Sequence, residues 1–428
     1  MAGVALGLDF GTTNSVAALA GGEAGDGAPE LVDYAGPEAT SAIFRSALCY
    51  WEEHGVQVEA GPWAIAEYLE YPEGSRFIQS FKSVAASAAF EHATLFGKRL
   101  GFEALGRTFL DRMIAHSGGR LESRPKRIVV GRPVEYAGSR PDPMLARRRY
   151  DGMFGGFGEE IVYVYEPIGA AFAFARRLDA PATILVADFG GGTSDFSVVR
   201  VEAPGAPRRC TPLGHAGIGI AGDRFDSQIV DRLVLPLLGK GGSYRSFDKL
   251  LEIPGGYFDD FGDWSRLALM RNPRTLAALH TLQRAAEDQA AIGRMIAIVE
   301  QELGYRLYDA VGKLKRALSG ADRAEFRFAG GGVEIAAEVE RCDFERWIAP
   351  DLARIETVMD RALAAADASE AAIDRVFLTG GSSLIPAVRA LFERRFGADR
   401  IAGGGELTSI AQGLALVALE EDIAAWAS

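Results

Sequence analysis

The chain has 428 residues, of which 48% are hydrophobic and 24% charged, and its net charge is −12. This length exceeds what one hydrophobic core usually holds together, so two or more lobes are expected, and the composition excludes a disordered chain. The negative charge argues against broad binding to nucleic acid or to an anionic membrane. Any phosphate site must therefore depend on local backbone N–H groups and a few cations.

Neither a secretion signal nor a membrane span is predicted. The N-terminus lacks a basic segment and Asp9 interrupts its apolar run, while the longest apolar stretch, 410–419, is too short for a bilayer. Cys49, Cys210 and Cys342 lack CxxC spacing, so we expect them to be packed as small hydrophobes in a reducing compartment. These features predict a soluble cytoplasmic protein.

Two distant segments share one pattern of a buried strand ending in Asp-Phe-Gly, a turn rich in glycine and threonine, and a returning strand. The first covers residues 4–20 and the second covers residues 184–201. Such a repeat predicts an internal duplication with one hairpin in each lobe.

Strands alternate with helices in the rest of the chain, which indicates α/β lobes. A loop is expected at 217–222, and a surface insertion rich in glycine, aspartate and aromatic residues at 239–272. The expected strands are 127–131, 161–165 and 376–379, and the expected helices are 147–153, 166–178, 223–238, a long helical stretch to 319, 343–366, one from 385 and one from 408.

The two hairpin turns are suited to binding phosphate. Glycines let backbone N–H groups approach an anion, and threonine hydroxyls at Thr12, Thr13 and Thr193 add donors. Asp9 and Asp188 end the strands just before the turns, where their carboxylates would repel a phosphate. A Mg²⁺ ion bound through one or two carboxylates and phosphate oxygens removes that conflict. Two such turns facing one another therefore predict a Mg-nucleotide site.

Five segments resemble, in order, motifs of the heat-shock protein 70 (DnaK-type) family. They are similar to its first phosphate, first connecting, second phosphate, adenosine and second connecting motifs, at 7–15, 165–171, 187–195, 377–386 and 410–415. The resemblance spans nearly the whole chain. It implies a two-lobed actin-like ATPase fold, of the ribonuclease H-like type, with ATP in the interlobe cleft.

The same resemblance implies lobe boundaries. Lobe I would cover 1–187 with an outer part at about 37–114, lobe II would cover 188–407 with an outer part at about 229–309, and a C-terminal helix at 408–428 would return to lobe I. Residues 130–134 and the chain length resemble the YegD-like branch of the family, which lacks the peptide-binding domain. No peptide-binding domain is therefore expected in this chain.

Roles for individual residues follow from the resemblance. Lys82 resembles the catalytic lysine, Glu166 and Asp195 would orient or activate the attacking water, and Asp9 and Asp188 would hold the magnesium waters. Thr193 would contact the γ-phosphate. The remaining nucleotide-binding residues would be Gly11, Thr12, Thr13, Asn14, Gly190, Gly191, Gly192, Gly222, Lys315, Arg316, Ser319, Gly380, Gly381, Ser382 and Leu384, and Pro133 resembles the hinge proline.

Some of these residues have a plainer interpretation. Lys82 could be a solvated surface lysine, Glu166 could serve as a helix-start acid stabilised by the helix dipole, and the segment 313–319 could be an ordinary amphipathic surface. The chain also departs from the family around the base. Leu384 replaces a stacking arginine, Gly312 replaces a glutamate and Leu407 replaces an aspartate, so weaker base selectivity is expected.

Three functions fit these features. The first is a chaperone-like ATPase that binds ATP or ADP with Mg²⁺, hydrolyses ATP slowly as a monomer, and signals lobe closure to a partner protein or co-chaperone. The second is an actin-like filament or scaffold protein, which ATP-dependent light scattering would reveal. The third is a small-molecule kinase of the same fold, which phosphotransfer to added sugars would reveal.

Overall fold

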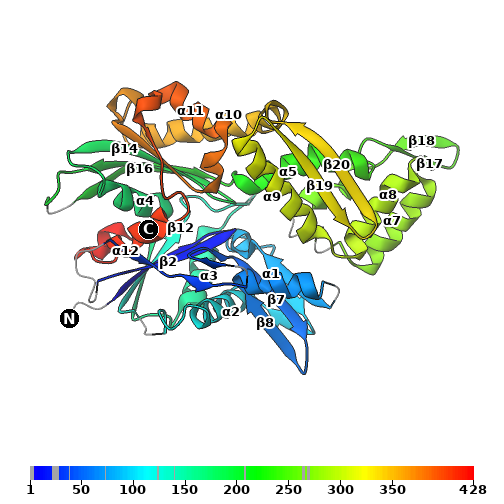
Figure 1. Cartoon of the computed structure of the whole chain (residues 1–428), viewed down its shortest axis with the longest axis horizontal. Helices are drawn as coiled ribbons and strands as arrows, with labels where there is room; N and C mark the ends of the chain where they lie inside the picture. The colour runs from blue at the N-terminus through cyan, green and yellow to red at the C-terminus, as the bar shows by residue number, and fades with distance from the viewer. Residues whose placement is uncertain are drawn as a thin grey trace. The chain divides into compact units, whose positions relative to one another are not determined.

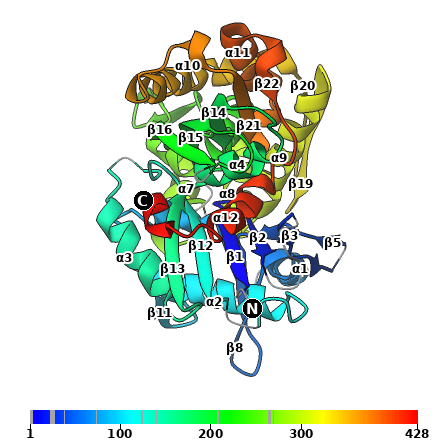
Figure 2. The ribbon, with the colours of Figure 1, turned by 90° about the vertical axis from the view of Figure 1, so that its left-hand side faces the viewer.

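The computed structural model describes residues 4–21, 28–37, 39–72, 74–122, 125–138, 140–206, 209–262, 266–267 and 270–428. Within these residues the chain is mixed α/β with several sheets, as predicted (Figures 1 and 2). It forms two compact units, one comprising Met1–Gly222 with Ala353–Ser428 and the other comprising Asp223–Leu352. The predicted lobe boundaries divide the chain at other positions than these two units do, and they stay a prediction.

The first unit contains two sheets with the same strand order. In each, a central antiparallel hairpin has an antiparallel neighbour on one side and two parallel strands on the other. The first sheet runs β3 (Glu30–Leu31), β2 (Asn14–Ala20), β1 (Ala5–Phe10), β12 (Arg127–Arg132) and β13 (Glu160–Tyr165). The second runs β16 (Cys210–Ile218), β15 (Ser194–Val201), β14 (Ala182–Phe189), β21 (Arg375–Thr379) and β22 (Ile401–Ala402). This correspondence confirms both hairpins and supports the predicted duplication.

Helix α12 (Ser409–Val417) packs on the first sheet at very short range. It lies against β1, β2 and α4 (Glu166–Ala175) (Figure 2). Its approach depends on glycine, because a Cβ on Gly413 would lie 1.6 Å from the Gly169 carbonyl oxygen and one on Gly7 would lie 2.2 Å from the Ala415 nitrogen. The contact therefore joins backbone to backbone and fixes the start of α4, where Glu166 lies.

Gly413→Ala is expected to lower the free energy of unfolding by about 3 kcal/mol or more, because the added methyl group must push two backbones apart. Urea unfolding followed by circular dichroism measures the change. Gly320→Ala is the control, since nothing lies within 4 Å of its Cβ position, and it should be neutral or slightly stabilising. Equal stability of Gly413→Ala and wild type would show that the two helices can separate freely.

Smaller elements complete the first unit. A three-stranded sheet and three helices surround an aromatic core that includes Phe10, Phe81, Phe109 and Tyr150. The sheet is β7 (Ala47–Glu52), β8 (Val56–Ala60) and β9 (Ser75–Gln79), and the helices are α1 (Gly61–Glu70), α2 (Phe102–Ala115) and α3 (Pro143–Phe154). The unit also holds β4 (Tyr34–Ala35), β5 (Thr40–Ser41), β6 (Phe44–Arg45), β10 (Ala93–Leu95), β11 (Lys98–Leu100) and α11 (Pro386–Phe396).

The second unit is mainly helical, with two hairpins. Its elements are α5 (Gly222–Ile229), β17 (Ser243–Ser246), β18 (Lys249–Glu252), α7 (Pro273–Ala285), α8 (Gln289–Glu300), α9 (Gly304–Gly320), β19 (Arg323–Gly330) and β20 (Val333–Glu340), and α10 (Arg341–Ala365) continues into the first unit. Part of the predicted insertion, 263–265 and 268–269, lies outside the described residues.

Several expected boundaries were wrong. β16 extends to Ile218, so the predicted loop at 217–222 begins two residues later. The expected helix at 223–238 is α-helical only to Ile229, and continues as a π turn and a 3₁₀ turn around Pro236, which has no N–H for an α-helical bond. The prediction that the thiols are buried is confirmed for Cys49 and Cys210, but Cys342 is exposed. None of the helices described is long and apolar enough to cross a membrane.

Candidate nucleotide-binding site

The turns of the two hairpins face one another. A Cβ on Gly192, in the second turn, would lie 3.1 Å from the hydroxyl oxygen of Thr12 in the first turn. Gly11 is required for the first turn itself, because a Cβ there would lie 2.2 Å from the Asn14 carbonyl oxygen. The structure thus brings together the two predicted phosphate-binding turns, each with glycine backbone and threonine hydroxyls.

The first turn is braced by residues of a distant segment. The Ser46 hydroxyl donates to the Gly11 carbonyl at 2.7 Å, and the Ser46 backbone N–H donates to the Thr13 carbonyl at 3.0 Å. Arg45 Nη1 donates to Asn14 Oδ1 at 2.9 Å, which orients the Asn14 amide so that its NH₂ group can donate elsewhere. Arg45 and Ser46 were not predicted as site residues, because no local motif marks them.

The second turn gathers three other predicted residues. The Gly222 backbone N–H donates to the Gly190 carbonyl at 3.2 Å, and the Ser382 hydroxyl lies 3.4 Å from the same oxygen. Gly380 has a φ of 78°, and a Cβ on it would lie 2.2 Å from the Phe189 carbonyl oxygen and 2.7 Å from Asp188 Oδ1. Glycine is therefore needed where the loop after β21 meets the second turn.

A buried ion pair lies at the same site. Lys82 Nζ is 2.6 Å from Glu166 Oε1, and each side chain is only 7% exposed. Lys82 comes from the 3₁₀ turn Phe81–Val84, and Glu166 is the first residue of α4. The interpretation of Lys82 as a surface lysine is therefore wrong. Glu166 begins a helix, as its plainer interpretation expected, and it also binds the lysine.

Three buried aspartates near this pair have raised pKa values, first because of burial and then because of Glu166. Burial raises the pKa of Asp9 to about 7, with Glu166 raising it further and Lys82 opposing. Burial also raises the pKa of Asp195 to about 7, while hydrogen bonds from the Thr193 side chain and from the Val134 and Glu135 backbone N–H groups act to lower it. The pKa of Asp188 is raised well above its usual range by burial and by the surrounding carboxylates.

Asp188 and Asp195 are direct neighbours across the second hairpin, a like-charge pairing that destabilises a sheet. Asp195 Oδ1 accepts the Val134 N–H at 2.8 Å, and a Cβ on Gly217, opposite it on β16, would lie 2.4 Å from that oxygen. Gly217, which was predicted to lie in a loop, therefore leaves room for the Asp195 side chain.

The residues present fit a magnesium ion held through water. Glu166, Asp9 and Asp188 lie near the ammonium group of Lys82, and Asp188 Oδ1 is buried without a hydrogen-bond partner among the described residues. The part of the chain that the structure describes contains no group of three or more acidic, histidine or cysteine side chains placed to ligate a metal directly. Asp9 and Asp188 match an ion that keeps most of its waters, as Mg²⁺ commonly does.

The predicted adenosine contacts divide between the two units. In the first unit Leu384 is 56% exposed and Leu407 is 39% exposed, and Leu407 Cδ2 would lie 3.6 Å from a Cβ on Gly381. In the second unit α9 carries Lys315, Arg316 and Ser319. Lys315 Nζ pairs with Asp226 Oδ1 at 2.8 Å, the Ser319 hydroxyl donates to the Lys315 carbonyl, and Arg316 is exposed. The roles of these residues at a nucleotide stay predictions.

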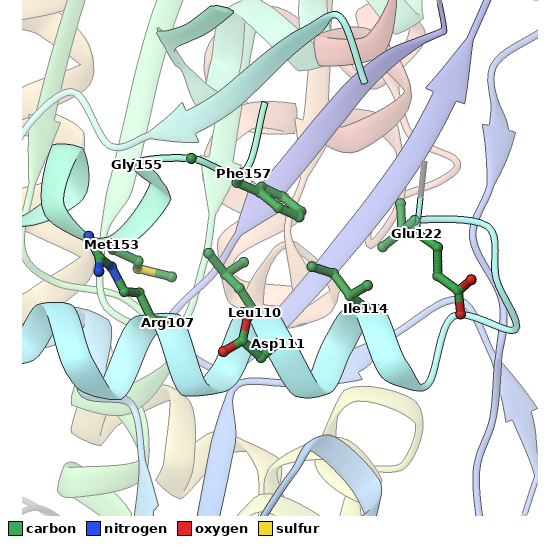
Figure 3. A pocket seen from close by; sticks show the side chains of 10 residues that line it. Arg107, Leu110, Asp111, Ile114, Glu122, Met153, Gly155 and Phe157 are labelled. Atoms are coloured by element: carbon green, nitrogen blue, oxygen red, sulfur yellow. The ribbon is translucent and has the colours of Figure 1, made fainter. Parts of the chain in front are cut away.

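A separate cavity of about 260 Å³ lies beside α2 and the C-terminal end of α3. Leu110, Ile114, Met153 and Phe157 line its apolar part, and charged side chains of α2 and of the following loop line the remainder (Figure 3). None of the predicted site residues lines this cavity, so it is distinct from the facing turns.

Comparison with known proteins places the chain near one family. Residues 293–419 match the family model of the Hsp70 protein. Over 416 residues the chain is 25% identical to the stromal 70 kDa heat shock-related protein, chloroplastic, of Pisum sativum, and the match covers 92% of this chain and 50% of that relative. The chain thus spans about half the length of the curated relative. Both similarities support the relationship to the Hsp70 family that the five motifs predict.

Proposed function

We propose that this chain is an Hsp70-type ATPase of the actin-like fold, which binds Mg-ATP between its two hairpin turns and hydrolyses it slowly. The observation that carries the proposal is the approach of Gly192 to Thr12, because it sets two donor-rich turns face to face beside Asp9, Asp188 and Lys82. Lobe closure around the nucleotide would be the output, read by a partner protein or co-chaperone.

Each residue at the site has a chemical task in this proposal. The turn N–H groups and the hydroxyls of Thr12, Thr13 and Thr193 bind phosphate oxygens, and Lys82 neutralises negative charge that develops during phosphoryl transfer. Glu166 and Asp195 orient the attacking water and accept its proton, a role for which the raised pKa of Asp195 is suited. A magnesium ion held by Asp9 and Asp188 through water would neutralise charge on the phosphates.

Thermal unfolding tests the nucleotide site directly. Millimolar Mg-ATP is expected to raise the melting temperature of the pure protein, because a ligand that binds only the folded state stabilises it by mass action. Scans with ATP and EDTA separate the nucleotide from the metal, and a phosphate-release assay then measures hydrolysis. Superimposable scans with and without Mg-ATP would contradict the proposal. Light scattering that rises with ATP would favour the filament alternative.

We expect ATP to be preferred over GTP by only about tenfold (~1.4 kcal/mol). A site discriminates strongly when the wrong ligand leaves its own buried polar groups unpaired. Leu384 and Leu407 are apolar and exposed, and Gly312 has no side chain, so none of these three positions penalises guanine. Competition of GTP against a fluorescent ATP analogue measures the ratio. A preference beyond about a thousandfold would mean that other residues rebuild the base pocket.

Further parts of the proposal rest on sequence resemblance. We propose, from the resemblance of the segment 130–134, that the chain belongs to the YegD-like branch and corresponds to the nucleotide-binding part of longer relatives. A cytoplasmic location and a monomeric state complete the proposal. Size-exclusion chromatography with and without Mg-ATP checks the monomer.

A further inference from the structure

Arg149 is a buried arginine whose guanidinium group donates hydrogen bonds to four backbone carbonyls. It lies on α3 and is 7% exposed. Nη1 donates to the carbonyl oxygens of Val84 at 2.7 Å, Ala85 at 3.0 Å and Ser87 at 3.0 Å, and Nη2 donates to that of Phe90. Because Nη1 carries two hydrogens, one of them is shared between two carbonyls. The four carbonyls thus form a cage around one cation.

Such a buried charge is unusual without an acidic partner. Among the described residues, the carboxylate that acts on Arg149 is that of Glu103, through its charge and without a hydrogen bond. Burial accordingly lowers the pKa of the guanidinium group, with Glu103 opposing. Burying an ion is unfavourable unless hydrogen bonds replace its lost water. Because these bonds go to backbone carbonyls of the loop at 84–90, Arg149 constrains the backbone of that loop directly.

The caged loop begins immediately after Lys82. The Ala85 N–H donates to the Lys82 carbonyl at 3.0 Å, and the Ser87 N–H donates to the Val84 carbonyl at 3.1 Å, so the loop is a series of tight turns. On the other side of Lys82, Ser80 has a φ of 53°, a left-handed conformation that is unfavourable for a residue other than glycine. The segment that carries Lys82 is therefore strained at one end and clamped by Arg149 at the other.

We infer that Arg149 is a positioning residue for Lys82: by holding the carbonyls of residues 84–90 it keeps the Lys82 ammonium group beside Glu166. The link is short, because Val84 ends the same 3₁₀ turn that contains Lys82. This inference rests on the proposed role of Lys82 in ATP hydrolysis. It assigns Arg149 no contact with nucleotide.

The kinetic test compares Arg149→Ala with Arg148→Ala, its exposed neighbour on the same helix. Arg149→Ala should lower kcat about a hundredfold with KM changed less than about threefold, because small displacements of a catalytic group reduce turnover by that order. Arg148→Ala should match wild type. Adding about 10 mM guanidinium, far below denaturing concentrations, should raise the kcat of Arg149→Ala at least about tenfold, because the ion refills the carbonyl cage. Arg149→Lys should recover less, because an ammonium group lacks the planar fork.

A second measurement is independent of hydrolysis. Lys82 is buried, so an amine-reactive reagent should label it slowly, and mass spectrometry of the peptide containing it gives the rate. In Arg149→Ala the rate should rise about tenfold or more, as expected for a side chain released from its buried pair, and guanidinium should reverse the rise. If wild type binds no nucleotide but this labelling pattern holds, the proposed function fails while the positioning role stands. Unchanged Lys82 labelling in folded Arg149→Ala, or loss of fold that neither guanidinium nor Arg149→Lys reverses, would overturn the inference.

Discussion

Lys82→Ala is expected to lower kcat for ATP hydrolysis by about a hundredfold to a thousandfold while changing the Kd for Mg-ATP by less than about fivefold. Lys82 is the cation paired with Glu166 in the buried site, so its removal withdraws positive charge where the transferring phosphoryl group gains negative charge. The backbone donors of both turns are unaffected, and they hold the ground-state nucleotide. Single-turnover kinetics and calorimetry separate the two effects.

The control for this variant is Lys98→Ala, which removes an exposed lysine on β11. It should behave as wild type in both measurements. Asp188→Asn should resemble Lys82→Ala, with turnover reduced far more than affinity, because Asp188 is placed to hold the magnesium waters. Equal losses of binding and turnover would reduce Lys82 and Asp188 to structural roles.

Asp195→Asn is expected to stabilise the ligand-free protein at pH 8 by about 2 kcal/mol, although it should reduce hydrolysis about a hundredfold. Burial and Glu166 raise the pKa of Asp195 to about 7, so at pH 8 the fold holds an ionised carboxylate that it disfavours. Asparagine carries no such charge, and its amide oxygen can still accept the Val134 N–H that Asp195 Oδ1 accepts at 2.8 Å.

The sign of the pH dependence follows from linkage. Between pH 4 and pH 7 the folded protein retains a proton on Asp195 that the unfolded chain has lost, so the free energy of unfolding falls as pH rises through this window. The advantage of Asp195→Asn should therefore be small at pH 4 to 5 and full at pH 8. Urea unfolding of both proteins without nucleotide, at pH 4 to 5 and at pH 8, measures the two stability differences. Asp111→Asn, at an exposed position of α2, should show no such difference. A stability gain independent of pH would contradict the electrostatic explanation.

The parts of the site that could be predicted are encoded locally. The Asp-Phe-Gly turns at β1 and β14 contain their own glycines and threonines, so strand, turn and chemistry follow from a few adjacent residues. Arg45 could not be predicted, because it reaches Asn14 only after β6 has paired with β2. Arg149 belongs to a run of three arginines at 147–149, and nothing in that run shows that only the third is buried.

Other errors have a similar origin. A lone thiol is buried or exposed according to the face of the strand or helix on which it lies, and Cys342 lies near the start of α10 on an exposed face. Gly217 was expected in a loop because a glycine-rich segment resembles one. The carboxylate of Asp195 on the neighbouring strand explains why glycine occurs there inside a strand.

The glycine contact between α12 and the first sheet also bears on how the chain is made. Gly7 on β1 contacts Ala411 and Ala415 of α12, so β1 is synthesised about 400 residues before the helix that covers it. At ordinary rates of translation that delay is roughly 20 to 80 s. During this delay, the face of β1 that α12 will cover lacks its final packing partner. Assembly of the first unit is thus expected to finish only after synthesis of α12, and a nascent chain stalled before residue 409 should be markedly more sensitive to protease than the released protein.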